Sequence, residues 1–502
     1  MKTIEKKSNL NNKQNIVAMD NKEIVKKNKL EYTKLKDIII AVLLIIWMII
    51  PMLKELKFTS TIIVIYEYRI MEIIGLIGIY LFIYDIYRKI KNTQDKKQII
   101  KEIAPILILV LYLIWTLIAC FFAQDKYKAF YGTRERNEGY ITYLIYGGFF
   151  LSAFLIDSNK IKKVLLNVFL IVAILNIIFI NLVNNNMLLV KVFNYRNIQT
   201  GVFGNLNHYG YYLLLATVIA CILFVIEKNR FIKVTYLIAY LILLYTLIYN
   251  NTFGCYIALC TTLLLFLIYS IKVKNNMKSS IAILLIFIIL SVIVQKDGKI
   301  IAMNNMSSIF KDIQTLCNIG KSDSNINNSN INNNASDDKA DNVSSNKNSK
   351  VSNENTSVSD WEKAGSGRAK LWKYGIKMIT QKPLLGYGAE NLRQEYAKYG
   401  IDQDRPHNLL IQLATTSGIP GLLLYMSAII LILFRGFKRL KNKECNNIFL
   451  AVYFAVIAYL ISAMFGNSMY YTSPYFFILL GMVMNFEKTV DNKQKTLYNI
   501  CA

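Results

Sequence analysis

Long apolar runs, separated by short polar or basic segments, recur along most of this 502-residue chain. A helix of about 20 apolar residues spans the hydrocarbon core of a bilayer, and it satisfies its own backbone there. The pattern therefore predicts an all-α polytopic membrane protein with about twelve transmembrane helices. The expected helices cover residues 38–53, 70–87, 104–123, 140–157, 164–183, 208–226, 234–250, 254–271, 279–295, 416–434, 447–465 and 471–485.

The positive charges agree with this arrangement. A formal net charge of +26 is also found in proteins that bind nucleic acid, but here Lys and Arg gather in alternate gaps between the apolar runs. The first 36 residues hold ten Lys, whereas the turns 251–253 and 466–470 hold no Lys or Arg. By the positive-inside rule, both termini are expected on the cytoplasmic side of the cytoplasmic membrane. The expected partner is therefore the lipid bilayer and not nucleic acid.

One gap is much longer than the others. It is the loop 296–415, between the ninth and tenth predicted helices, and it is expected on the extracytoplasmic side because long loops are translocated largely regardless of charge. Within it, about 318–359 is dominated by Asn, Ser, Asp and Lys and is predicted to be disordered, whereas 361–408 is predicted to be ordered. The other expected divisions are a basic cytoplasmic tail 1–36, helices one to nine within 37–295, helices ten to twelve within 416–485 and a cytoplasmic tail 486–502.

The ordered part of the loop is expected to contain an amphipathic helix from Arg368 to Gln381. Lys370, Lys373 and Lys377 share one face of this helix, and apolar residues line the other face. Such a helix can simply lie on the membrane surface. The functional alternative is that Arg368, at the start of the helix, binds an anionic lipid head group.

His407 is one of only two histidines in the chain, and it lies where the polar loop meets the next apolar run. A histidine at this position can cap a helix end, or it can exchange a proton near neutral pH. Asp402 and Asp404, which precede it, resemble the acidic pair that holds a metal in many sugar transferases. Because two acids in a polar loop are more often solvated surface, we expect no metal ion here.

The loop and the helix start after it contain four motifs in a fixed order. They are Arg368 with Leu371-Trp372, then Pro383-Leu384-Leu385-Gly386-Tyr387-Gly388, then His407-Asn408, and then Gly418-Ile419-Pro420-Gly421. In order and spacing these motifs resemble those of the O-antigen ligase and O-antigen polymerase superfamily. Two earlier segments also resemble family motifs, namely 132–139 and 201–208, the second with Arg196 upstream. Many members carry a Ser-Arg pair near position 252, and Asn250-Asn251-Thr252-Phe253-Gly254 lacks it here. An anion-binding role at that position therefore does not carry over.

The resemblance implies a metal-independent, cofactor-free glycosyltransferase with a GT-C-like fold. It would move a glycan from an undecaprenyl diphosphate carrier to a hydroxyl of a glycan, lipid or protein acceptor outside the cytoplasmic membrane, for cell-surface polysaccharide synthesis. Arg368 would bind the departing diphosphate, and His407 would act either as a general base or as an imidazolium that binds the diphosphate. The expected substrate-binding residues are Arg136, Glu138, Arg196, Asn205, Asn207, Glu390, Arg393, Arg405 and Asn408. Several of them are equally suited to capping helices.

Two other functions stay open from the sequence alone. A polymerase that joins carrier-linked repeats would carry the same motifs as a ligase. A transporter or flippase is a rival from a different class, because twelve helices with both termini inside are also typical of major facilitators. That class usually has a long central cytoplasmic loop, whereas the gap between the sixth and seventh predicted helices is short.

Overall fold

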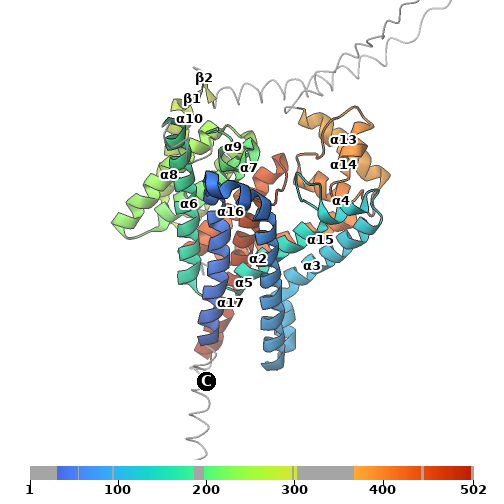
Figure 1. Ribbon diagram of the computed structural model, residues 1–502. Helices are drawn as coiled ribbons and strands as arrows, with labels where there is room; N and C mark the ends of the chain where they lie inside the picture. The colour runs from blue at the N-terminus through green and yellow to red at the C-terminus, as the bar shows by residue number, and fades with distance from the viewer. Residues whose placement is uncertain are drawn as a thin grey trace, which may run out of the picture.

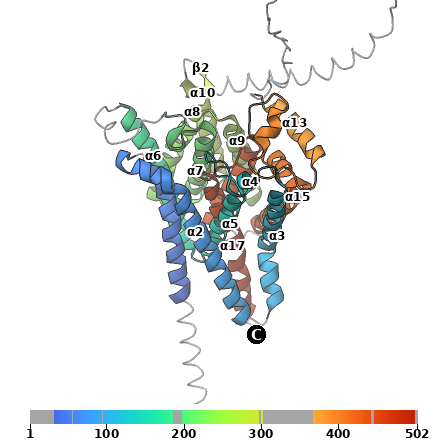
Figure 2. The ribbon, with the colours of Figure 1, turned by 45° about the vertical axis from the view of Figure 1, so that its right-hand side comes forward.

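The computed structural model describes residues 31–54, 56–92, 95–185, 197–296, 299–301, 367–441 and 446–498. Within these ranges the protein is a bundle of long helices with a group of short elements at one end (Figures 1 and 2). The expected disordered segment 318–359 and Arg196 lie outside the described residues.

Nine helices of the described residues are long and apolar enough to cross a membrane. They are Glu31–Leu53, α2 (Lys57–Asn92), α3 (Lys96–Phe121), α6 (Asn159–Asn185), α7 (Leu206–Ile226), α8 (Arg230–Asn250), α9 (Phe253–Val273), α15 (Leu409–Lys441) and α16 (Asn447–Ser462) with the adjoining 3-10 turn η3 (Ala463–Phe465). Shorter apolar helices are α5 (Tyr140–Leu155), α10 (Met277–Ile293) and the first part of α17 (Ser473–Tyr498). Each predicted transmembrane segment overlaps one of these helices, so the prediction of an all-α polytopic membrane protein is confirmed.

The remaining elements are short. They are α4 (Lys126–Tyr131), the 3-10 turn η2 (Gly201–Phe203), the antiparallel strands β1 (Gln295–Lys296) and β2 (Lys299–Ile300), α13 (Arg368–Gln381) and α14 (Leu392–Ala397). In Figure 1, α13, α14 and α4 lie together at the same end of the bundle as the two strands. This end carries the loop motifs.

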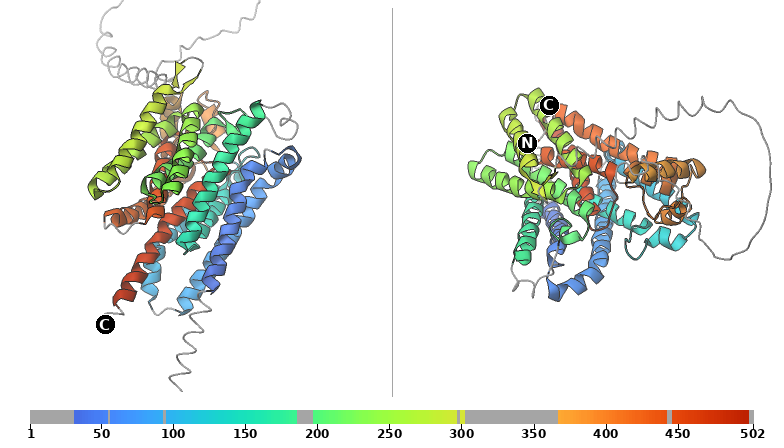
Figure 3. Two further views of the ribbon diagram at one scale, coloured as in Figure 1. Left: turned by 90° about the vertical axis from the view of Figure 1, so that its left-hand side faces the viewer. Right: turned by 90° about the horizontal axis from the view of Figure 1, so that it is seen from above.

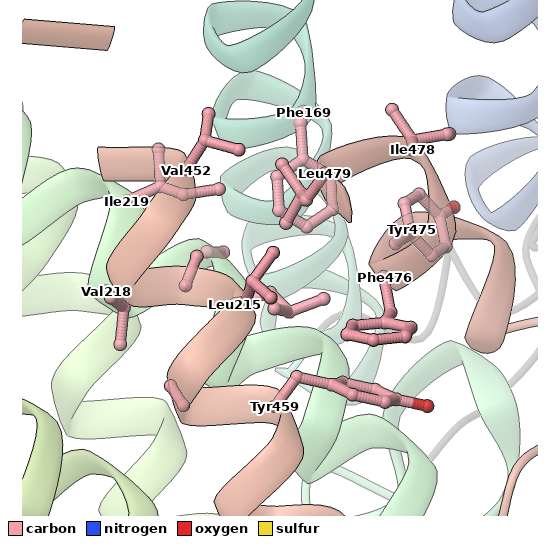
Figure 4. Packing of buried hydrophobic residues seen from close by; sticks show 14 of the residues in the cluster. Phe169, Leu215, Val218, Ile219, Val452, Tyr459, Tyr475, Phe476, Ile478 and Leu479 are labelled. Carbon is pink, nitrogen blue, oxygen red and sulfur yellow. The ribbon is translucent and has the colours of Figure 1, made fainter. Parts of the chain in front are cut away.

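The core of the bundle forms around α7, which is buried on almost all sides. It packs against α6, α8 and α16, and the views of Figure 3 show the long helices running side by side. Figure 4 shows Leu215 and Ile219 of α7 beside Phe169 of α6 and Val452 of α16. A helix buried all round has no polar face, and beyond Asn207 and His208 in its first turn the sequence of α7 is almost entirely apolar.

α15 consists of two helical segments joined at Gly418, where the backbone has φ 72° and ψ 177°. The segment that follows α13 docks into this break: Tyr387 N donates to Thr415 O at 2.8 Å, and Ile419 N donates to Pro383 O at 2.7 Å. A Cβ atom at Gly418 would lie 1.9 Å from the Leu384 carbonyl oxygen, so only glycine fits. The Pro383–Gly388 motif and the Gly418–Gly421 motif are therefore two halves of one contact. The expected loop boundary at 415 lies inside this helix.

α13 has the predicted bounds, and part of its apolar surface packs on the protein, whereas Ile376 is 55% exposed. Leu371 and Met378 are buried in a small core with Tyr396 of α14, and a Cβ atom at Gly375 would lie 2.6 Å from the side chain of Ile411 of α15. Leu371, Gly375 and Met378 therefore fix α13 on the protein, and contact of this helix with the membrane surface stays a prediction. This packing sets the position of Arg368.

Candidate functional site

Arg405 is the centre of a buried charged cluster, which we define as Arg405, Glu390 and Glu138. Only 2% of the surface of Arg405 is exposed. The guanidinium forms an ion pair with Glu390 and donates to Ser468 O at 2.8 Å, and Glu390 also accepts a hydrogen bond from Thr133 Oγ1 at 2.9 Å. The cluster thus connects the loop before α15 with two other segments that are distant in sequence. A buried ion is tolerated when it is paired, and each charge of this ion pair has such a partner. The substrate-binding role of these residues stays a prediction.

Glu138 is fully buried at the start of α5. It accepts hydrogen bonds from Tyr146 and, at 2.9 Å, from Ser468 Oγ. Burial raises the pKa of Glu138 to about 7, although the positive charge of Arg405 and the two hydrogen bonds act in the opposite direction. Glu138 therefore changes its protonation near neutral pH.

Replacing Glu138 with glutamine is expected to change how stability depends on pH. Because the pKa of this carboxyl is higher in the folded protein than its ordinary value of 4.5, the folded state binds the proton more tightly, and Glu138 lowers stability as pH rises toward and above 7. Glutamine does not titrate, so the variant should gain stability relative to the wild type between about pH 5 and pH 8. Thermal unfolding in detergent measures this; a constant difference across that range would contradict the assignment.

Two further arginines of the predicted site are also paired with acids. Arg136 binds Asp404 with both ends of its fork, at 2.5 Å from Nε to Oδ2 and at 3.1 Å from Nη2 to Oδ1. Arg393 pairs with Asp402 at 3.0 Å, and both side chains are largely exposed. Each carboxylate of the acidic pair is therefore held by an arginine. Arg393 lies on the surface and not in the charged cluster.

A cleft of about 410 Å³ lies between α13 and the loop before α15. It brings together three residues that the sequence had singled out: Arg368 from the start of α13, His407 from the loop, and Asn207 from the first turn of α7. The complete lining is Asn207, Gly367, Arg368, Lys370, Leu371, Gly400, Ile401, Gln403 and His407. Two cationic residues, Arg368 and Lys370, thus line the same cleft as the imidazole of His407.

A hydrogen bond from α13 holds the loop that carries His407. Trp372 Nε1 donates to Pro406 O at 2.9 Å. His407 has a positive φ of 53°, which is uncommon for a residue with a side chain. Such a conformation persists when the surrounding contacts enforce it, and it is often found at functional sites.

The His407 ring contacts Asn467 of the turn after η3, where the side-chain amide nitrogen lies 3.1 Å from Nδ1. Burial and the nearby Arg368 lower the pKa of His407 to about 4. The imidazole is therefore neutral at neutral pH. A neutral imidazole can act as a base, whereas the alternative role as a diphosphate-binding imidazolium requires the charged form.

Two of the remaining predicted residues act locally as helix caps. Asn205 accepts hydrogen bonds from the backbone N–H groups of Asn207 and His208 at the start of α7. Asn408 accepts from Leu410 N and Ile411 N at the start of α15, and its amide also donates to Met464 O at 3.1 Å. These contacts are those of N-cap residues. The two caps fix the start of α7, which carries Asn207, and the start of α15, which follows His407.

Sequence reasoning did not find Asn467 and Ser468. Both belong to the turn 466–470, whose lack of Lys and Arg indicated only its side of the membrane. Asn467 contacts His407, and Ser468 contacts Glu138 and Arg405, so this turn connects the cleft with the charged cluster. The available signal was its polar sequence, Gly466-Asn467-Ser468, between two apolar helices.

In a comparison with protein families, residues 238–426 match the family described as O-antigen ligase. This match, over less than half of the chain, supports the resemblance to the O-antigen ligase and polymerase superfamily. The matched range contains Arg368 and His407, whereas Glu138 and Asn467 lie outside it. A search of curated proteins gave no match. The family assignment favours a membrane enzyme that acts on lipid-linked glycans over a transporter.

Proposed function

We propose that this protein is a metal-independent glycosyltransferase of the O-antigen ligase type. It transfers a glycan from undecaprenyl diphosphate to an acceptor hydroxyl on the outer face of the cytoplasmic membrane, and both of its termini are cytoplasmic. The observation that carries the proposal is the cleft in which Arg368, Lys370 and His407 meet at one end of the helix bundle. This end is the one expected to be extracytoplasmic.

The cleft has to stabilise the negative charge of the diphosphate leaving group. In the transfer, the acceptor oxygen forms a bond to the anomeric carbon, the bond from that carbon to the diphosphate breaks, and the carrier departs with the bonding electrons. Negative charge therefore builds on the diphosphate, and a cation placed beside it lowers the barrier. Arginine is well suited because its fork binds phosphate oxygens bidentately and stays charged.

Arg368 is the arginine best placed for this role. The arginines at positions 136, 393 and 405 each pair with a carboxylate. Among the described residues, Arg368 forms no ion pair, and it faces the cleft beside Lys370. Its charge is therefore directed to whatever anion enters. We assign the diphosphate contact to Arg368, with support from Lys370.

His407 is proposed to accept the proton of the acceptor hydroxyl. Its low pKa keeps the ring neutral in the cleft. For Nε2 to act as the base, Nδ1 must carry the proton and donate it to Asn467, and rotation of the amide brings its oxygen to that position. Asn467 then positions the ring, in the way that a hydrogen-bonded neighbour fixes a histidine tautomer elsewhere.

Replacing Asn467 with aspartate tests this assignment. A carboxylate beside Nδ1 stabilises the imidazolium, so the pKa of His407 should rise and the transfer rate should increase with pH between about 5 and 7. Asn467→Ala should show no such rise, and the His407→Gln, Asn467→Asp double variant should lose it. A pH profile of Asn467→Asp that does not differ from that of Asn467→Ala would rule out His407 as the base.

The function itself is tested in proteoliposomes that contain the full chain, a synthetic undecaprenyl diphosphate glycan and an acceptor. We expect glycosylated acceptor and one undecaprenyl diphosphate per transfer, at a rate that a metal chelator does not change. A ladder of lengthening carrier-linked glycan without acceptor product would instead assign polymerase activity. Consumption of neither substrate, or movement of intact donor across the bilayer, would contradict the proposal.

A further inference from the structure

A second cavity lies far from the cleft, at the other end of the long helices. It is a groove of about 570 Å³ formed by the last turns of α9 and α15 and by the middle of α16. α15 begins beside His407 and ends at Lys441, which lines the groove. Because α15 is long enough to cross a membrane, the groove lies at the membrane face opposite to the cleft.

The walls of the groove are apolar and its end is basic. Leu265, Ile268 and Phe437 line it and are 40%, 49% and 56% exposed. Lys272 and Lys441, at the C-terminal ends of α9 and α15, complete it. Of the residues that line the groove, none is acidic; the full set is Leu265, Ile268, Tyr269, Lys272, Val273, Phe437, Leu440, Lys441, Tyr453, Phe454 and Ile457.

The shape of the groove is fixed by packing onto α16. Tyr453 donates from its hydroxyl to Leu433 O of α15 at 2.9 Å, and a Cβ atom at Gly436 would lie 2.4 Å from the Tyr453 ring. On the other side, the rings of Phe266 of α9 and Phe454 of α16 are 5.1 Å apart. α16 is thus the floor, and α9 and α15 are the two walls.

We propose that this groove binds an anionic diacyl phospholipid from the membrane leaflet on the side opposite to the cleft. The acyl chains would lie along the apolar walls, and the phosphate would lie between Lys272 and Lys441. Basic pockets between transmembrane helices recognise anionic head groups in this way, and each lysine near the surface adds to the attraction. The apolar part favours a lipid over a soluble phosphate, because only a lipid covers both the walls and the charges.

Native mass spectrometry of the full-length protein, titrated with phosphatidylglycerol, tests the proposal. The Lys272→Gln, Lys441→Gln variant should bind about thirty-fold more weakly, as the loss of two surface lysines implies. Lys278→Gln, Lys438→Gln removes two charges from the same end of the molecule outside the groove, and it should bind within about twofold of the wild type. Ile457→Trp keeps both lysines but fills the groove, and it should also lose lipid.

Three results would overturn the proposal. They are equal loss of phosphatidylglycerol in the two lysine variants, equal binding of phosphatidylcholine by the wild type, and lysine-dependent binding of glycerophosphate as tight as that of the lipid. The last result would indicate an anion site without a lipid component. Glycan transfer is not the readout, so the outcome does not depend on the function proposed for the cleft.

Discussion

Arg368→Ala is expected to lower the rate of glycan transfer by about 10²- to 10³-fold, the usual cost of removing one group that stabilises charge in a transition state. The reason is that the diphosphate gains charge as the glycosidic bond breaks, and Arg368 faces the cleft in which this happens. Arg368→Lys should recover part of the rate, because it keeps the charge but not the bidentate fork. The assay is product formation in proteoliposomes at saturating donor.

Lys377→Ala is the matched control. Lys377 lies on the same helix, but its Nζ lies 5.0 Å from the centroid of the Tyr399 ring, and it does not line the cleft. Its removal should leave the transfer rate within about twofold of the wild type, as is usual for a substitution that touches no transition-state contact. Equal rates for Arg368→Ala and the wild type, with folded protein in both samples, would remove Arg368 from the mechanism.

Arg405→Ala is expected to destabilise the protein by about 3–5 kcal/mol, because it leaves a buried charge without its partner. The carboxylate of Glu390 would lose its ion pair, and Ser468 O would lose its donor. Denaturant or thermal unfolding in detergent measures this loss. Reduced transfer by this variant would follow from unfolding of the loop before α15 and would not identify Arg405 as a catalytic residue.

Arg393→Ala provides the comparison for Arg405. Both side chains of the Arg393–Asp402 pair are largely exposed, and such pairs contribute little to stability. Its unfolding midpoint should therefore stay close to that of the wild type. If Arg405→Ala were as stable as Arg393→Ala, the buried charged cluster would not be structural, and a role for Arg405 in substrate binding would become the better explanation.

The helices were predictable because membrane crossing is a local property of sequence. A run of about 20 apolar residues is helical wherever it meets the bilayer, and this holds without knowledge of its neighbours. The amphipathic segment from Arg368 to Gln381 was equally local. The start of α15 was not local, because the helix expected over 416–434 placed Gly418 in its first turn. Its break is instead filled by the backbone of Pro383 and Leu384, more than 30 residues earlier.

The site was predictable only in part, for a related reason. The motifs suggested that Arg368 and His407 belong together, and both line the cleft. The sequence could not show that Arg405, only two residues before His407, is buried in an ion pair. Nor could it show that Asn467 contacts His407 across 60 residues of chain. Such pairings depend on how helices pack, and neither spacing nor periodicity encodes them.

The most direct test of the cleft as the transfer site is photocrosslinking with an undecaprenyl diphosphate glycan that carries a diazirine on its first sugar. After irradiation in proteoliposomes and proteolysis, labelled peptides are mapped by mass spectrometry. The account predicts labels in 367–371 and 400–407, and loss of these labels when unmodified donor is added in excess. Labels that are displaced by unmodified donor but map only to segments outside the cleft would contradict it.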